Sequence, residues 1–244
     1  MREQVLEDFQ RKHAILFSDK ALLDQALTHS SYVRQKQHKK GMKDNEKLEF
    51  FGDAVLKLLV SEYLYIKYPD WNEGTLTKIR AYLISDKFLA KLALQLGLGA
   101  YIQFSFGERN SGGATRASNL ANAFEALLGA YYIDQGLESV RRFLLEVLQQ
   151  SKDGEAIEDF MDYKTQLQEW AQQQKLLLPN YRLTKAEGPD HCKVFHVTAH
   201  IQKKEHIHTF DGIGQTKKEA EQHAAKQACE ALKIGDSHGL ANCF

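Results

Sequence analysis

The sequence is poor in cysteine and in long apolar runs, and each shortage removes a class of protein. Its three cysteines are an odd number and lack the spacing of a zinc site, which argues against a disulfide framework and fits a reducing cytoplasm. No apolar run approaches the ~20 residues of a membrane-spanning helix, and the polar N-terminal segment does not resemble a signal peptide. We therefore expect a cytoplasmic protein with no membrane partner.

The chain also lacks net charge, since 32 basic and 32 acidic side chains balance. Only the C-terminal part is mildly basic: residues 161–234 hold 11 lysines and arginines, nine acids and six of the ten histidines. That excess is too small to predict RNA or DNA binding by itself. Any prediction of a nucleic-acid partner must therefore rest on specific positions.

One stretch, residues 45–60, concentrates acids in a helical pattern. Glu46, Glu49 and Asp53 are spaced i, i+3 and i+7, within roughly 60° on one helix face, opposite an apolar stripe. The pattern indicates three acids that repel without a base between them, a repulsion that a bound cation would relieve. The alternative is an acidic helix start favoured by the macrodipole, with Asn45 as N-cap. That alternative explains Glu46 and at most Glu49, but not Asp53 two turns further on.

A further acid lies in an apolar helix later in the chain. The glycine-rich stretch 105–117 is either a plain connector or a backbone-lined anion contact, and residues 119–134 after it are strongly helical. In that helix Asn122 and Glu125 are spaced i, i+3 and share a face. Because burying an unpaired carboxylate is costly, we expect Glu125 to have a partner.

The hydrophobic periodicity divides the chain into two domains. Residues 1–150 show helical intervals and no convincing strand, which predicts an all-α domain. Residues 151–160 are polar, as in a linker. Residues 161–233 change to helix, three alternating strands and helix, and residues 234–244 look like a C-terminal tail. The expected fold is therefore multidomain, an all-α domain followed by an α-β-β-β-α domain.

Both parts resemble known domains. The stretch Asn45-Glu-Lys-Leu-Glu-Phe-Phe-Gly-Asp-Ala-Val-Leu56 resembles the signature of the ribonuclease III family. Residues 161–233 resemble a double-stranded RNA-binding domain, and the domain order is similar to that of bacterial ribonuclease III. The markers of the second domain are residues 164–169, 188–191, Phe195, 212–214 and 216–225.

This resemblance implies a metal-dependent endoribonuclease. The family hydrolyses double-stranded RNA with Mg²⁺, leaves 5′-phosphate and 3′-hydroxyl ends with short 3′ overhangs, and processes structured precursors such as ribosomal RNA. Mn²⁺ is expected to substitute for Mg²⁺, and no small-molecule cofactor beyond the metal is implied. The implied metal ligands are Glu49, Asp53, Asn122 and Glu125, of which Asp53 and Glu125 are catalytic, with Glu46 and Glu73 as auxiliary acids.

Asn122 departs from the family pattern, which usually has aspartate there. An amide oxygen can coordinate Mg²⁺ but brings no negative charge, so we expect a weaker metal site. The departure is either natural variation or a substitution that traps an inactive complex. It is the only support for a competing function, a double-stranded RNA-binding protein with a decayed nuclease domain. The presence of Glu49, Asp53 and Glu125 favours the active enzyme.

The resemblance also implies how RNA and a second subunit are bound. One helix and one loop would meet successive minor grooves, and a helix N-terminus would meet the phosphates between them. Phe50 lies beside the acidic face and is expected at a homodimer interface, where a C2 dimer supplies one nuclease site for each RNA strand. The implied RNA-binding residues are Thr165, Gln168, Glu169, His191, Lys217 and Lys218.

Overall fold

The computed structural model describes residues 2–36, 41–69, 71–151, 163–189, 192–203 and 206–234. The chain forms two compact units, one from residues 1–69 and 76–159 and the other from residues 70–75 and 160–244. Nearly all of the predicted linker and tail lies outside the described residues, as does His191. In the part of the chain that is described, no helix is long and apolar enough to cross a bilayer.

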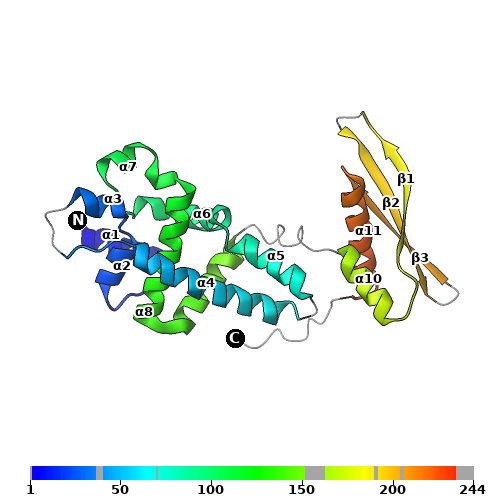
Figure 1. The fold of residues 1–244 in the computed structure, drawn as a ribbon, viewed down its shortest axis with the longest axis horizontal. Helices are drawn as coiled ribbons and strands as arrows, with labels where there is room; N and C mark the ends of the chain where they lie inside the picture. Colours follow the sequence, from blue (N-terminus) through cyan, green and yellow to red (C-terminus); the bar gives the residue numbers. More distant parts are fainter. Residues whose placement is uncertain are drawn as a thin grey trace. The chain divides into compact units, whose positions relative to one another are not determined.

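Residues 2–151 form helices, as the sequence predicts. The elements are α1 (Arg2–Lys12), α2 (Lys20–Ala26), α3 (Ser30–Gln35), α4 (Glu46–Lys67), α5 (Glu73–Leu83), α6 (Asp86–Gln95), α7 (Phe106–Asn110) and α8 (Ala117–Gln150), with 3-10 turns at Leu98–Ala100 and Gly113–Thr115 (Figure 1). Between residues 2 and 151, the described backbone contains no strand, only an isolated bridge between Thr28 and Gln103. The prediction of an all-α domain is therefore confirmed.

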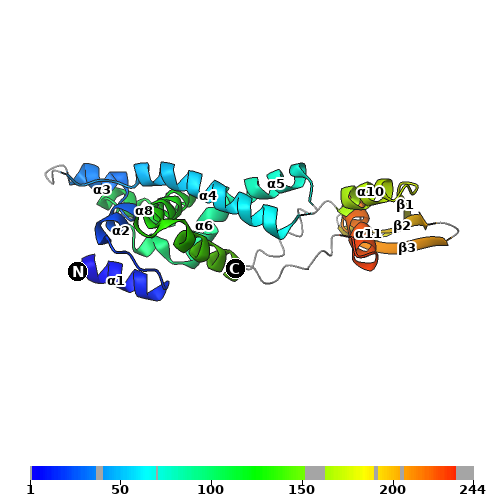
Figure 2. The ribbon, with the colours of Figure 1, turned by 90° about the horizontal axis from the view of Figure 1, so that it is seen from below.

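The core of this unit is built on the crossing of α4 and α8, which lie side by side in Figures 1 and 2. A Cβ placed on Gly52 would lie 1.8 Å from the carbonyl oxygen of Glu125, and one on Gly129 would lie 2.4 Å from that of Leu48. Such distances leave no space for a side chain, so only glycine lets the two backbones come this close. The crossing brings the first half of α4 against the first half of α8.

Two further features fix α8. The helix is interrupted at Gly136, where φ is 77° and ψ is 177°, a conformation open to glycine and strained for other residues. This break lies where the sequence predicts the end of a helix. Helices α2 and α6 also pack on α8, and the side chain of Ser85 caps α6 by accepting from the backbone N–H of Phe88.

The second unit is an antiparallel three-stranded sheet covered on one face by two helices (Figure 2). Its elements are α10 (Tyr163–Gln173), β1 (Asn180–Glu187), β2 (Val194–Lys203), β3 (His206–Gly214) and α11 (Lys217–Ala231), in strand order β1-β2-β3. Leu167 from α10, Ile201 from β2 and Ala225, Ala228 and Cys229 from α11 form its buried core. The predicted α-β-β-β-α order is confirmed.

The structure corrects three local predictions in the helical unit. Asn45 has a helical conformation and its side chain makes no capping hydrogen bond to α4. The sequence of residues 71–75 predicts a turn with Thr75 as the cap of the next helix. Helix α5 instead begins at Glu73, because Asn72 Oδ1 accepts from the N–H of Thr75 at 2.9 Å. The stretch 105–117 contains the short helix α7 and a 3-10 turn.

Candidate active site

Acidic side chains from three helices meet beside the crossing of α4 and α8. Glu49 and Asp53 project from α4, Glu125 from α8 and Asp86 from the first turn of α6, and their charges act on one another. Glu46, the first residue of α4, adds to the negative charge around Glu49. The structure therefore brings the predicted acids of α4 and α8 together, although they are far apart in the sequence.

Glu125 shows the strongest electrostatic effect of this arrangement. Partial burial, followed by the repulsion of nearby carboxylates, raises the pKa of Glu125 to about 7. The carboxylates responsible are those of Asp53, Glu49 and Asp86, and the ammonium group of Lys57 opposes them. A carboxyl group in this environment favours its neutral form until a positive charge approaches.

Glu49 accepts a hydrogen bond from Asn122, the residue that the family resemblance implied as a metal ligand. Burial and the charge of Glu46 raise the pKa of Glu49, whereas a hydrogen bond from Asn122 lowers it. The amide of Asn122 is the donor, because an ionised carboxylate only accepts. An aspartate at this position could not donate such a bond at neutral pH, so Asn122 gives this site a contact that the usual family residue would lack.

Two charged residues of the site were missed by the sequence analysis. Lys57 Nζ lies 2.7 Å from Asp53 Oδ2, so a base one turn beyond the three acids of α4 pairs with the last of them. The i, i+4 spacing of Asp53 and Lys57 is visible in the sequence and is typical of a helical ion pair. The sequence gives no such signal for Asp86, because an acid in the first turn of a helix is commonly stabilised by the helix dipole alone.

The oxygen atoms of these side chains have the chemistry that a hard divalent cation requires, but the side chains are not arranged to bind one. Carboxylate and amide oxygens are the ligands that Mg²⁺ prefers, and the raised pKa of Glu125 reflects a cluster short of positive charge. Among the described residues, no group of three His, Cys, Asp or Glu side chains is arranged so that it could hold a metal ion. Carboxylates that repel move apart, and Asp53 is paired with Lys57, so side-chain rotation must accompany metal binding.

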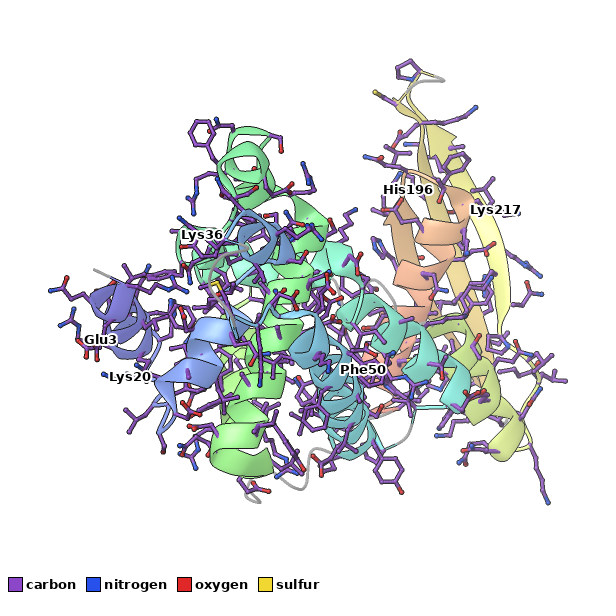
Figure 3. The ribbon with its side chains drawn as sticks, turned by 60° about the vertical axis from the view of Figure 1, so that its left-hand side comes forward. Glu3, Lys20, Lys36, Phe50, His196 and Lys217 are labelled. Carbon is purple, nitrogen blue, oxygen red and sulfur yellow. The ribbon has the colours of Figure 1, made fainter. Side chains whose placement is uncertain are left out.

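Two other residues predicted for the nuclease are exposed. Glu73 is the exposed first residue of α5, and neither of the acids with raised pKa values has Glu73 among the main causes. Phe50 is 81% exposed on α4 (Figure 3), and Leu58 and Tyr65 on the same helix are 55% and 75% exposed. These three side chains, which we call the α4 apolar stripe, are uncovered in the single chain.

The stretch 105–117 has internal partners for the arginines that could have bound an anion. Arg116 forms an ion pair with Glu108. Arg109 donates to the carbonyl of Ile102 at 2.8 Å and lies over the ring of Phe104. The contacts favour the structural interpretation of this segment over an anion site.

In the second unit, the described RNA-binding candidates lie at the surface of two helices. Gln168 is exposed and Thr165 and Glu169 are partly exposed on α10. Lys217 and Lys218 are exposed at the start of α11 (Figure 3), which is capped by Thr216 through a hydrogen bond to the N–H of Glu219. Lysines at a capped helix N-terminus combine their own charge with the helix dipole, an arrangement suited to phosphate.

Known proteins match both units. Residues 19–151 match the family described as Ribonuclease-III-like, and residues 163–232 match the double-stranded RNA binding motif. A ribonuclease 3 from Nitratiruptor sp. is 45% identical over 93% of this chain and 97% of its own length, and one from Enterococcus faecalis is 43% identical over 95% and 99%. The nuclease domain of ribonuclease III from Campylobacter jejuni, described for its structural flexibility in a region involved in dimer formation, is 40% identical with a TM-score of 0.56, over 60% of this chain and 98% of that domain.

A helical nuclease domain followed by a double-stranded RNA-binding domain defines an endoribonuclease that acts on double-stranded RNA. The chain belongs to the ribonuclease III family, whose members are generally metal-dependent.

Proposed function

We propose that this chain is a Mg²⁺-dependent endoribonuclease that leaves 5′-phosphate and 3′-hydroxyl ends with short 3′ overhangs. The meeting of Glu49 and Asp53 from α4 with Glu125 from α8 supports the proposal, because burial and then the repulsion of these carboxylates raise the pKa of Glu125 to about 7. A divalent cation would relieve that repulsion. Mn²⁺ would serve in place of Mg²⁺, since it accepts the same oxygen ligands.

The acidic residues and Asn122 would have different roles in this function. Glu49, Asp53, Glu125 and the amide oxygen of Asn122 would hold Mg²⁺, which when bound neutralises phosphate charge and acidifies water. Asp53 and Glu125 are the acids closest to the reacting groups in this assignment. A bound cation would lower the pKa of Glu125 again, so that its carboxylate is ionised during turnover. Glu46 and Glu73 would act from outside, as auxiliary acids.

The second domain would deliver the substrate. Thr165, Gln168 and Glu169 on α10 would contact one minor groove, and Lys217 and Lys218 on α11 the phosphates across the major groove. His191 would contact the next minor groove. Such recognition follows the A-form shape, so we propose structured precursors, such as those of ribosomal RNA, as substrates. The domains would span residues 1–150 and 161–233, joined by the linker 151–160, in a cytoplasmic enzyme.

The α4 apolar stripe supports a homodimer. Phe50, Leu58 and Tyr65 expose large apolar side chains along one helix, and exposed apolar surface that gathers in one place usually marks an interface. A second copy of the chain, related by a two-fold axis, would cover the stripe with the same stripe. Two nuclease sites, one for each strand, would then produce the staggered ends.

Incubation with long double-stranded RNA, with and without Mg²⁺ or Mn²⁺, tests the function. We expect cleavage only with metal, none of single-stranded RNA of the same sequence, and none by Glu125→Gln, which keeps the size of the side chain but removes its charge. Binding without cleavage at every metal concentration would instead support the competing function, a double-stranded RNA-binding protein with a decayed nuclease domain. Direct sequencing and labelling of the products would test the proposed ends.

A further inference from the structure

Lys57 on α4 places a positive charge beside the acidic side chains of the candidate site. Its Nζ atom is 2.7 Å from Asp53 Oδ2, and the two side chains are 52% and 37% exposed. Its charge also acts on Glu125 across the helix crossing. Lys57 therefore pairs with Asp53 on its own helix and also acts through its charge on an acid of α8.

We propose that Lys57 is a positioning residue whose ammonium group holds Asp53 and offsets the repulsion of the acidic cluster while no metal is bound, and that it leaves Asp53 when a divalent cation arrives. This inference rests on the proposed metal-dependent function. It adds a residue of this chain to that function, one that competes with the cation for the same carboxylate.

The charges around the site explain why such a residue is useful. The charges of Asp53 and Asp86 act on both Glu49 and Glu125, and Glu46 also acts on Glu49. Several carboxylates at close range disfavour their joint ionisation. Asn122 reduces the problem by donating a hydrogen bond to Glu49 where the usual aspartate would add another negative charge. Lys57 and Asn122 thus change the cluster in the same direction, since both stabilise it without a metal.

Lys57 and Asn122 would also weaken the binding of a metal ion. A cation that uses Asp53 must first separate the carboxylate from Lys57, and the ammonium group left nearby then repels the cation. An exposed ion pair is worth roughly 0.2–1 kcal/mol, so breaking the pair weakens metal binding by a few-fold. The interaction that stabilises the site without metal therefore lowers its affinity for metal.

The test compares two lysines that make similar ion pairs. Lys57→Met removes the charge and keeps an unbranched apolar stem. Lys20→Met is the control, because Lys20 Nζ lies 2.8 Å from Glu7 Oε1 with side-chain exposures of 44% and 54%. Lys20 also pairs with Glu3 at 3.2 Å, and it lies on α2 and not on α4 (Figure 3). Lys57→Arg restores the charge. Each full-length variant is titrated with Mg²⁺ and with Mn²⁺ by calorimetry in the absence of RNA, and unfolded by urea in chelator and in saturating Mg²⁺.

We expect Lys57→Met to bind either metal about three- to fivefold more tightly, while Lys20→Met and Lys57→Arg stay within about twofold of the starting chain. Lys57→Met should also lower the urea midpoint in chelator but not in saturating Mg²⁺. Lys20→Met should shift the midpoint equally in both. A merely structural pair moves stability in both conditions and leaves the affinity for metal unchanged.

Unchanged or weaker metal binding by Lys57→Met would overturn the inference, as would an equal loss of stability with and without Mg²⁺. Either result leaves the proposed nuclease function intact, provided that the unsubstituted chain binds metal. If the unsubstituted chain takes up neither cation and cleaves no double-stranded RNA, the proposed function itself fails, and the inference fails with it.

Discussion

Gly52 on α4 lies directly against the main-chain carbonyl of Glu125 on α8, so that a Cβ on Gly52 would be 1.8 Å from that oxygen. The contact joins the scaffold to the site, because Glu49 and Asp53 flank Gly52 on one helix and the other helix supplies Glu125. The spacing of the two backbones therefore determines where the carboxylates stand relative to one another.

Gly52→Ala should destabilise the helical domain by about 3 kcal/mol or more, since the added methyl group meets backbone that cannot rotate away. Urea unfolding followed by circular dichroism measures the change. Gly107→Ala is the control, because a Cβ there would meet nothing within 4 Å and alanine is the better helix former. Equal stability of the two variants would contradict the close crossing.

Asn122→Asp should lower the Mg²⁺ concentration required for half-maximal cleavage several-fold, because it adds a charged ligand. The same change should lower stability in chelator, since Glu49 loses a hydrogen-bond donor and gains a repelling neighbour. Cleavage titrations and urea unfolding measure the two effects. An unchanged or higher Mg²⁺ requirement would count against Asn122 as a ligand.

The metal-free protein should lose stability as the pH rises from about 4.5 to about 7. Folding raises the pKa of Glu125 from its ordinary 4.5 to about 7, so the folded state binds the proton more tightly than the unfolded state across this range. Below a pH of about 4.5 this group does not reduce the free energy of unfolding, and above a pH of about 7 it reduces it by the full amount. After allowance for the partial exposure of the carboxyl group to solvent, we expect ~1–2 kcal/mol.

Urea unfolding in chelator at pH 5 and pH 8 checks this dependence. Glu125→Gln should flatten the change because glutamine does not titrate, and saturating Mg²⁺ should flatten it by favouring the ionised carboxylate. A pH dependence that is the same in Glu125→Gln would assign the effect to other groups.

Phe50→Asp should convert a dimer to monomers at micromolar concentration, because it places a charge in the α4 apolar stripe. Sedimentation velocity measures the mass. Phe106→Asp is the matched control: Phe106 is 73% exposed but lies on α7. Dimers that survive Phe50→Asp, or dissociate equally with Phe106→Asp, would argue against this stripe as the interface.

Replacing Lys217 and Lys218 together by alanine should weaken binding to double-stranded RNA at physiological salt by about tenfold. It should also reduce the slope of log K against log salt by about two, one for each lost phosphate contact. Binding curves at several salt concentrations measure both. Lys233→Ala, two residues beyond the C-terminal end of α11, should change neither. An unchanged slope in the double variant would refute the phosphate contacts.

Much of the fold could be predicted because helices and strands leave their periods in the sequence. The acid spacing of α4 and the alternation of β2 are local patterns, and both appear in the structure. Helix starts were less predictable, as Asn45 and Thr75 show, because a cap depends on which neighbouring side chain reaches the free N–H group first.

The site was only partly accessible from the sequence. The need of Glu125 for a partner could be predicted from its apolar surroundings, and the family resemblance implied Glu49 and Asp53 as its neighbours. Asp86 could not be predicted, because it comes from another helix. Lys57 was accessible through its spacing from Asp53 and was overlooked because the acids alone defined the pattern. The contact of Gly52 with Glu125 depends on tertiary packing, for which a single sequence carries no local signal.

The glycine crossing also has a consequence for the order of folding. Glu49 and Asp53 stand far from Glu125 along the chain, so closing that long loop must precede any shared ligation. An unfolded chain cannot present these oxygens together, and a cation that binds them can stabilise only the folded state, by an amount that grows with its concentration. A rise of the thermal unfolding midpoint with Mg²⁺ would thus report that α4 and α8 have already docked.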